Sequence, residues 1–225
     1  FIKENTEKLA QSVDKAYTQH GKKRNPENVR FLVKTNPFIV ETIIEIINHY
    51  KIDLVVMGTQ GAAGLKKVIF GSNTANLIKQ VKCDVLAIPK EADYRKPIRR
   101  IAMASTLHHV EDELKRAMLF AKFFDATIDV VHVYPVFPDG IDLEKLDNHA
   151  FLERLQNIYP KVNLYFMRTN GDNETEVGLA EFLRVYKPDM LIMHPRTKDF
   201  WENLLDGSVS NLFVSNTKIP LITLK

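Results

Sequence analysis

The residue types best suited to ligand binding are concentrated in one glycine-rich stretch, MGTQGAAGLKKVIFGSNT (57–74). It contains the pattern G-x2-G-x9-G-S, formed by Gly58, Gly61, Gly71 and Ser72. Glycines let a backbone approach a ligand closely and adopt positive φ. A helical pattern follows, so free N–H groups and a hydroxyl would lie at a helix N-terminus, which suits phosphate oxygens. The spacing matches neither a Walker A sequence nor a GxGxxG fingerprint. It predicts a phosphate-binding loop, and a merely tight strand-to-helix connection is the alternative.

The stretch that leads into this loop occurs twice in the chain. KIDLVVMG (51–58) and KPDMLIMH (187–194) align without a gap, and the same offset in numbering brings Gly71-Ser72 onto Gly207-Ser208. Self-similarity at one fixed offset indicates a duplicated unit. The chain therefore contains two copies of one unit.

The second copy gives the order of elements within the unit. Five apolar stretches predict strands, at 98–105, 127–135, 162–168, 189–193 and 219–224. Helical patterns separate these strands. Two of them lie at 110–124 and at 143–159. A third begins at a capping box formed by Asn173 and Glu176 and ends near residue 186, and a fourth follows residue 208. Strands that alternate with helices predict parallel βαβ crossovers in an open α/β sheet.

The first copy contains only the later elements of this order. We expect helices at 1–19, after Asn36 and Pro37, and at 72–80, with strands at 29–34, 53–57 and 84–88. Three elements have no counterpart and the chain starts at Phe1, so we expect earlier residues of the first unit to be absent from this sequence. The second unit, a second copy of the chain or those residues should fill the gap. A charged linker at 89–97 gives domains 1–92 and 93–225.

Each copy ends in a short apolar strand, at 84–88 and at 220–224. Unpaired edge strands of this kind need cover. We therefore expect the two strands to pair with each other or across a dimer.

The glycine pattern, preceded by DLVVM and followed by KCDVLAIP (82–89), resembles the ATP-binding signature of the universal stress proteins. The resemblance covers the whole chain as two tandem units, the first incomplete. It implies Rossmann-like units of the adenine nucleotide alpha hydrolase-like type with open parallel sheets. It further implies a homodimer or an intrachain pseudo-dimer paired through the last strands. In function it implies a cytoplasmic stress-response protein that binds ATP, with or without Mg²⁺.

The same resemblance assigns the nucleotide site to six residues of this sequence: Met57, Gly58, Gly61, Gly71, Ser72 and Asn73. The first two glycines would line the ribose and the phosphates. The third glycine, the serine and the amide of Asn73 would hold the phosphates, and Met57 would close the site by its backbone.

The second copy departs from the glycine pattern. His194 and Thr197 stand where the first copy has two glycines, so side chains should fill the space that a nucleotide would occupy. Loop 194–207 carries three acidic and two basic residues, whereas loop 58–71 carries two lysines and no acid. Thr106 stands where ATP-binding members of the family have an aspartate after the first strand. We expect no nucleotide in the second unit, and an incomplete adenine pocket in the first.

The composition is that of an ordinary globular protein, 45% hydrophobic and 26% charged, with a net charge of +3. Short basic clusters without interleaved aromatics do not predict nucleic-acid binding. No apolar run reaches the roughly 18 residues that a membrane span needs. Cys83 is the single cysteine, which leaves no disulfide framework and fits a reducing cytoplasm.

No catalytic residue and no metal site are expected. The loop holds no evident general base or nucleophile, so slow ATP hydrolysis is the most that we expect. His108-His109 and Glu111-Asp112 are adjacent pairs that do not converge on one ion. Two other functions stay open. One is a structural or interaction pseudo-dimer without nucleotide. The other is an enzyme such as a nucleotidyl transferase or an ATP pyrophosphatase, whose HxGH or SGGxDS signatures do not occur in this sequence.

Overall fold

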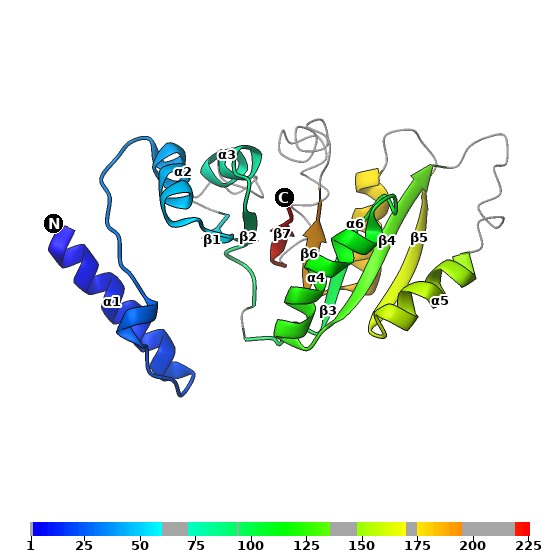
Figure 1. Cartoon of the computed structure of the whole chain (residues 1–225), viewed down its shortest axis with the longest axis horizontal. Helices are drawn as coiled ribbons and strands as arrows, with labels where there is room; N and C mark the ends of the chain where they lie inside the picture. The colour runs from blue at the N-terminus through cyan, green and yellow to red at the C-terminus, as the bar shows by residue number, and fades with distance from the viewer. Residues whose placement is uncertain (1, 60–71, 94, 136–147, 170–174, 195–218) are drawn as a thin grey trace. The chain divides into compact units, whose positions relative to one another are not determined.

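A computed structural model describes residues 2–59, 72–93, 95–135, 148–169, 175–194 and 219–225 (Figure 1). The chain divides into two compact units, residues 1–42 and residues 43–225, and each is described by itself. The domain boundary near residue 92 that the repeat predicts stays a prediction.

The smaller unit contains helix α1 (Ile2–Gln19), the 3-10 turn η1 (Pro26–Asn28) and the beginning of α2 (Ile39–Tyr50). An ion pair links Arg24 to Asp14 of α1, with 2.6 Å between Nε and Oδ1. The helix expected after Asn36 forms, and the backbone N–H of Phe38 donates to Asn36 Oδ1 at 2.9 Å.

Residues 29–34 do not form the expected strand. The stretch VRFLVK has strand-forming residues, but a strand also needs a neighbour to bond its backbone N–H and C=O groups. In the second copy the corresponding strand, β5 (Val162–Thr169), pairs with β4 (Thr127–Pro135). The described part of the first copy has no counterpart of β4, so the prediction is wrong.

The larger unit is built on one sheet, whose described strands follow the order β1-β2-β7-β6-β3-β4-β5. Besides β4 and β5, the sheet contains β1 (Leu54–Gly58), β2 (Asp84–Ile88), β3 (Arg100–Ala104), β6 (Met190–Met193) and β7 (Leu221–Thr223). All neighbouring strands are parallel except β2 and β7. The expected α/β class with a mostly parallel sheet is confirmed.

The closing strands of the two copies pair with each other. In antiparallel register, Val85 lies opposite Thr223 and Leu86 lies opposite Ile222. Next to this pair, Arg116 of α4 (Val110–Phe124) donates to the carboxylate of Asp84 at the start of β2. The expectation that each closing strand covers the other is confirmed within one chain.

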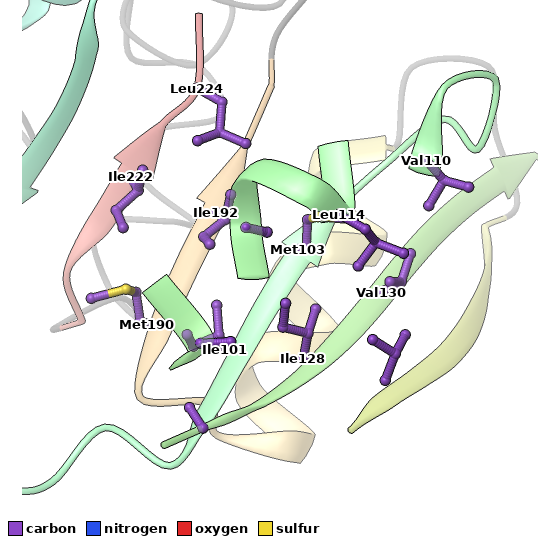
Figure 2. Close-up of a cluster of buried hydrophobic side chains, with 14 of the residues drawn as sticks. Ile101, Met103, Val110, Leu114, Ile128, Val130, Met190, Ile192, Ile222 and Leu224 are labelled. Carbon is purple, nitrogen blue, oxygen red and sulfur yellow. The ribbon is translucent and has the colours of Figure 1, made fainter. Parts of the chain in front are cut away.

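Helices cover both faces of the second copy's strands. α4 and α5 (Asn148–Ile158) pack on one face, where their apolar side chains join those of β3, β4 and β6 in the main core cluster. Figure 2 shows the members of this cluster that come from α4 and from the strands. Leu164 of β5 packs against this cluster, whereas the next residue, Tyr165, contacts Phe182 of α6 (Thr175–Tyr186) with ring centroids 5.1 Å apart. Successive residues of a strand point to opposite faces, so α6 covers the other side.

Candidate functional site

The glycine loop leaves the carboxyl end of β1 and joins the start of α3 (Ser72–Gln80). The hydroxyl of Thr74, in the first turn of α3, donates to the carbonyl oxygen of Gly58 at 3.1 Å. Thr74 is buried, with 2% of its surface exposed, and Leu77 and Ile78 one turn later are fully buried. These contacts fix the N-terminus of α3 beside the end of β1.

Both ends of the loop are open as far as the described residues reach. A Cβ added at Gly58 would meet no atom of the described residues within 4 Å. Asn73 is exposed, and the first turn of α3 contains no acidic residue. The first turn itself therefore does not neutralise the partial positive charge of the helix N-terminus. This arrangement can hold a phosphate group.

The structure describes only part of the six-residue site that the sequence assigns. Met57 and Gly58 end β1, and Asn73 lies in the first turn of α3. The hydrogen bond from Thr74 to Gly58 joins these two elements. Ser72 begins α3, and its side chain is not among those described. Gly61 and Gly71 lie outside the described residues. The site as a whole stays a prediction.

The corresponding place in the second copy holds a side chain beside a buried acid. His194 follows β6, and its Nδ1 lies 3.5 Å from Oε1 of Glu113 in α4. Glu113 is 4% exposed, and its other oxygen accepts a hydrogen bond of 2.5 Å from the hydroxyl of Ser105. Thr197 lies outside the described residues, and Thr106 after β3 is exposed. The end of β6 thus differs from the open position at Gly58 in both shape and charge.

The sequence patterns did not reveal Thr74 or Glu113. Thr74 is a small hydroxyl residue directly after the loop, at a position that can bond back to the strand end. Glu113 lies one helical turn before Ala117, on the face of α4 that enters the core. An acidic residue inside an apolar stripe is the signal that could have identified it.

A groove of about 630 Å³ lies at the opposite, amino end of β1 and β2. Its lining includes Asp53, Cys83, Asp84 and Arg116. Burial is the main cause that raises the pKa of the Cys83 thiol, and the neighbouring carboxylates act in the same direction. A thiol whose pKa is raised is mostly protonated at neutral pH, and a protonated thiol is a poor nucleophile.

We expect Cys83 to react slowly with iodoacetamide, several-fold below the rate of N-acetylcysteine at pH 8. The thiolate is the reacting form, and a raised pKa leaves less of it. The rate should keep rising between pH 8 and pH 9.5, because the thiolate is still forming in that range. Mass spectrometry of the alkylated chain measures this rate.

Lys225 supplies the control for this prediction. Its positive charge lowers the pKa of Cys83, against the effect of burial. Lys225→Gln should therefore slow the reaction further. A wild-type rate equal to that of the free thiol would contradict the prediction.

The part of the chain that the structure describes contains neither a candidate membrane span nor a candidate metal site. No helix there is long and apolar enough to cross a lipid bilayer. No three His, Cys, Asp or Glu side chains there are grouped so that they could hold a metal ion.

Comparison with known proteins gives one family. Residues 2–89 match the family model described as the universal stress protein family. A universal stress protein of Methanocaldococcus jannaschii is 42% identical over 48 residues. That match covers 21% of this chain and 28% of the relative, so it spans less than a third of that protein.

Solved structures show the same fold over most of the chain. A universal stress protein from Archaeoglobus fulgidus has a TM-score of 0.67 at 17% identity, covering 99% of this chain and 77% of that one. A putative universal stress protein from Pseudomonas aeruginosa has a TM-score of 0.63 at 15% identity, covering 97% of this chain and 78% of that one. At these identities the likeness establishes the fold.

Proposed function

Because the chain belongs to the universal stress protein family, we propose that it is a cytoplasmic stress-response protein that binds ATP through the glycine loop of its first copy. The observation that carries the proposal is the hydrogen bond from Thr74 to Gly58, which fixes a helix N-terminus beside an open backbone position. The six proposed site residues are Met57, Gly58, Gly61, Gly71, Ser72 and Asn73.

The chemistry of this site is that of binding. Backbone N–H groups at the start of α3 donate to phosphate oxygens, and the two lysines of the loop add positive charge. None of the six residues is a general base or a carboxylate ligand. ATP can therefore enter with or without Mg²⁺, and the ion would be held through the phosphates. Slow hydrolysis is the most that such a site would support.

The second copy is proposed not to bind ATP. Its counterpart of Gly58 is His194, next to the buried carboxylate of Glu113. A buried negative charge repels a polyphosphate more strongly than an exposed one, because water screens it less. We therefore propose one ATP per chain.

Titration calorimetry of the whole chain with ATP, in EDTA and in Mg²⁺, tests this function. We expect saturable binding with one site per chain. Universal stress proteins solved in complex with cAMP and with dAMP make these two compounds sensible additions to the ligand panel.

Ser72→Ala should weaken ATP binding at least tenfold, since it removes a hydrogen bond to a charged oxygen. Two sites per chain, or no binding at 1 mM ATP, would reject the proposal.

A second candidate is favoured by the pairing of β2 with β7. In this alternative the two copies form an intrachain pseudo-dimer that serves as a structural or interaction protein without nucleotide. The chain would then lack retained nucleotide after gentle purification, and Ser72→Ala would change no property of the protein. Native mass spectrometry distinguishes this candidate from the first.

A further inference from the structure

The C-terminal end of α3 is held by a residue of the second copy. The last four carbonyl groups of a helix have no donor within that helix. One of them, the carbonyl of Ile78, accepts a hydrogen bond of 2.5 Å from Nζ of Lys225. Ile78 is fully buried, so its carbonyl depends on a donor from the protein. Lys225 therefore caps the helix that begins at the end of the glycine loop.

The backbone of Lys225 is itself fixed in place. Its N–H donates to Oδ1 of Asp84 at 3.0 Å, and Arg116 of α4 donates to the same carboxylate. The preceding residue, Leu224, is fully buried, and its N–H donates to the carbonyl oxygen of Met193 at 2.8 Å. These bonds hold Lys225 between the end of β6 and the start of β2, beside the last turn of α3.

The sequence of the first copy has no equivalent of this lysine. The offset of the repeat places Pro89 at the position that corresponds to Lys225. Proline has neither a side-chain amine nor a backbone N–H to donate. The two copies are therefore complementary. The first contains the complete glycine pattern, and the second contains the lysine that caps the helix after that pattern.

Contacts at both ends of α3 decide how well this helix is ordered. It has nine residues, a length at which an isolated helix is only marginally stable in water. Thr74 bonds its first turn to Gly58, and Lys225 bonds its last turn to the second copy. A positive charge at a helix C-terminus also interacts favourably with the helix dipole. The N–H groups of the first turn can hold a phosphate only while that turn is helical.

We propose that the second copy raises the ATP affinity of the first by holding α3 through the side chain of Lys225. This inference rests on the proposed ATP site, and it gives the copy without the glycine pattern a role in that site. Lys225 is a positioning residue, because it acts through the helix and does not touch the nucleotide. A helix that is already ordered loses less entropy when it binds the phosphates, which raises the affinity.

Lys225→Met tests this inference in the whole chain, because methionine keeps an apolar side chain and removes the amine. Calorimetric titration should show about fivefold weaker ATP binding. In the absence of ATP, hydrogen exchange should become faster at the amides of α3 and stay unchanged at those of α5 in the second copy.

Lys79→Met is the matched control for the charge. Lys79 is exposed and lies in the same last turn of α3, so this variant removes an equal charge from the same helix end. Its affinity for ATP should stay within about twofold of the wild type, because water and salt screen an exposed charge. The contrast isolates the hydrogen bond to Ile78.

Gly178→Ala shows whether a loss of stability alone could produce the effect. Its Cβ would lie 2.5 Å from Cγ1 of Val133, so it should destabilise the second copy. Its ATP affinity and the exchange of the α3 amides should nevertheless equal those of the wild type.

The outcomes separate this inference from the proposed function. A wild-type chain that binds no ATP would overturn both. Wild-type binding with an equal affinity in Lys225→Met would overturn the inference alone. Equal losses of affinity in Lys225→Met and Lys79→Met, or an equal loss in Gly178→Ala, would also overturn it, because the contact with Ile78 would then not be the cause.

Discussion

Replacing Gly58 by valine is expected to lower the affinity for ATP at least tenfold while the protein stays folded. A Cβ at this position meets no atom of the described residues within 4 Å, and a β-branched residue suits a strand. The melting temperature should therefore move by no more than about 2 °C. In the proposed site, however, the added methyl groups lie where the backbone approaches the ribose and the phosphates. Calorimetric titration with ATP and a thermal melt measure the two effects separately.

His194→Val is the matched control, because it puts the same side chain at the equivalent position of the second copy. Its affinity for ATP should stay within about twofold of the wild type. Gly178→Ala provides the opposite contrast. Its Cβ would lie 2.5 Å from Cγ1 of Val133 and 2.9 Å from Cγ2 of Thr169, so it should lower the melting temperature without changing ATP affinity. If His194→Val loses ATP and Gly58→Val keeps it, the site lies in the other copy.

The duplicated pattern explains why much of the sheet could be predicted from the sequence. A parallel strand buried on both faces reads as a continuous apolar run, as in DMLIM (189–193). The constant offset then locates β1 and β2 from β6 and β7. Two short apolar edge strands need cover, so the sequence predicted that β2 and β7 pair with each other or across a dimer, and the structure shows the first of these.

Residues 29–34 show what such patterns cannot give. Their strand propensity is local, but a strand forms only when another strand satisfies its backbone groups. The contact between Glu113 and His194 is a similar case, because α4 and the end of β6 meet only in the folded chain. For the nucleotide site, the sequence located the two ends of the loop that the structure describes. The nucleotide-binding role of all six proposed site residues stays a prediction.

Replacing Arg100 by methionine is expected to destabilise the protein by about 3–5 kcal/mol. Asp129 of β4 is fully buried, and the Nε of Arg100 lies 2.9 Å from its Oδ2. Asn163 donates to the other carboxylate oxygen at 2.8 Å, but an amide carries no charge. Methionine would therefore leave an ionised carboxylate buried without a cation. It would also remove the 3.1 Å hydrogen bond from Arg100 Nη1 to the carbonyl of Tyr186, at the end of α6. Urea unfolding at pH 7, followed by circular dichroism, measures the loss.

The neighbouring residue supplies the control for this prediction. Arg99 faces Asp125 at 3.6 Å, and both side chains are well exposed, so Arg99→Met should move the urea midpoint far less. A second change tests the cause. Asp129→Asn removes the negative charge and keeps an oxygen for the amide of Asn163, so the double variant with Arg100→Met should regain part of the lost stability. Equal losses for Arg99→Met and Arg100→Met, or no recovery in the double variant, would mean that Arg100 does not stabilise the buried carboxylate of Asp129. The apolar packing around these residues would then hold β3, β4 and the end of α6 together.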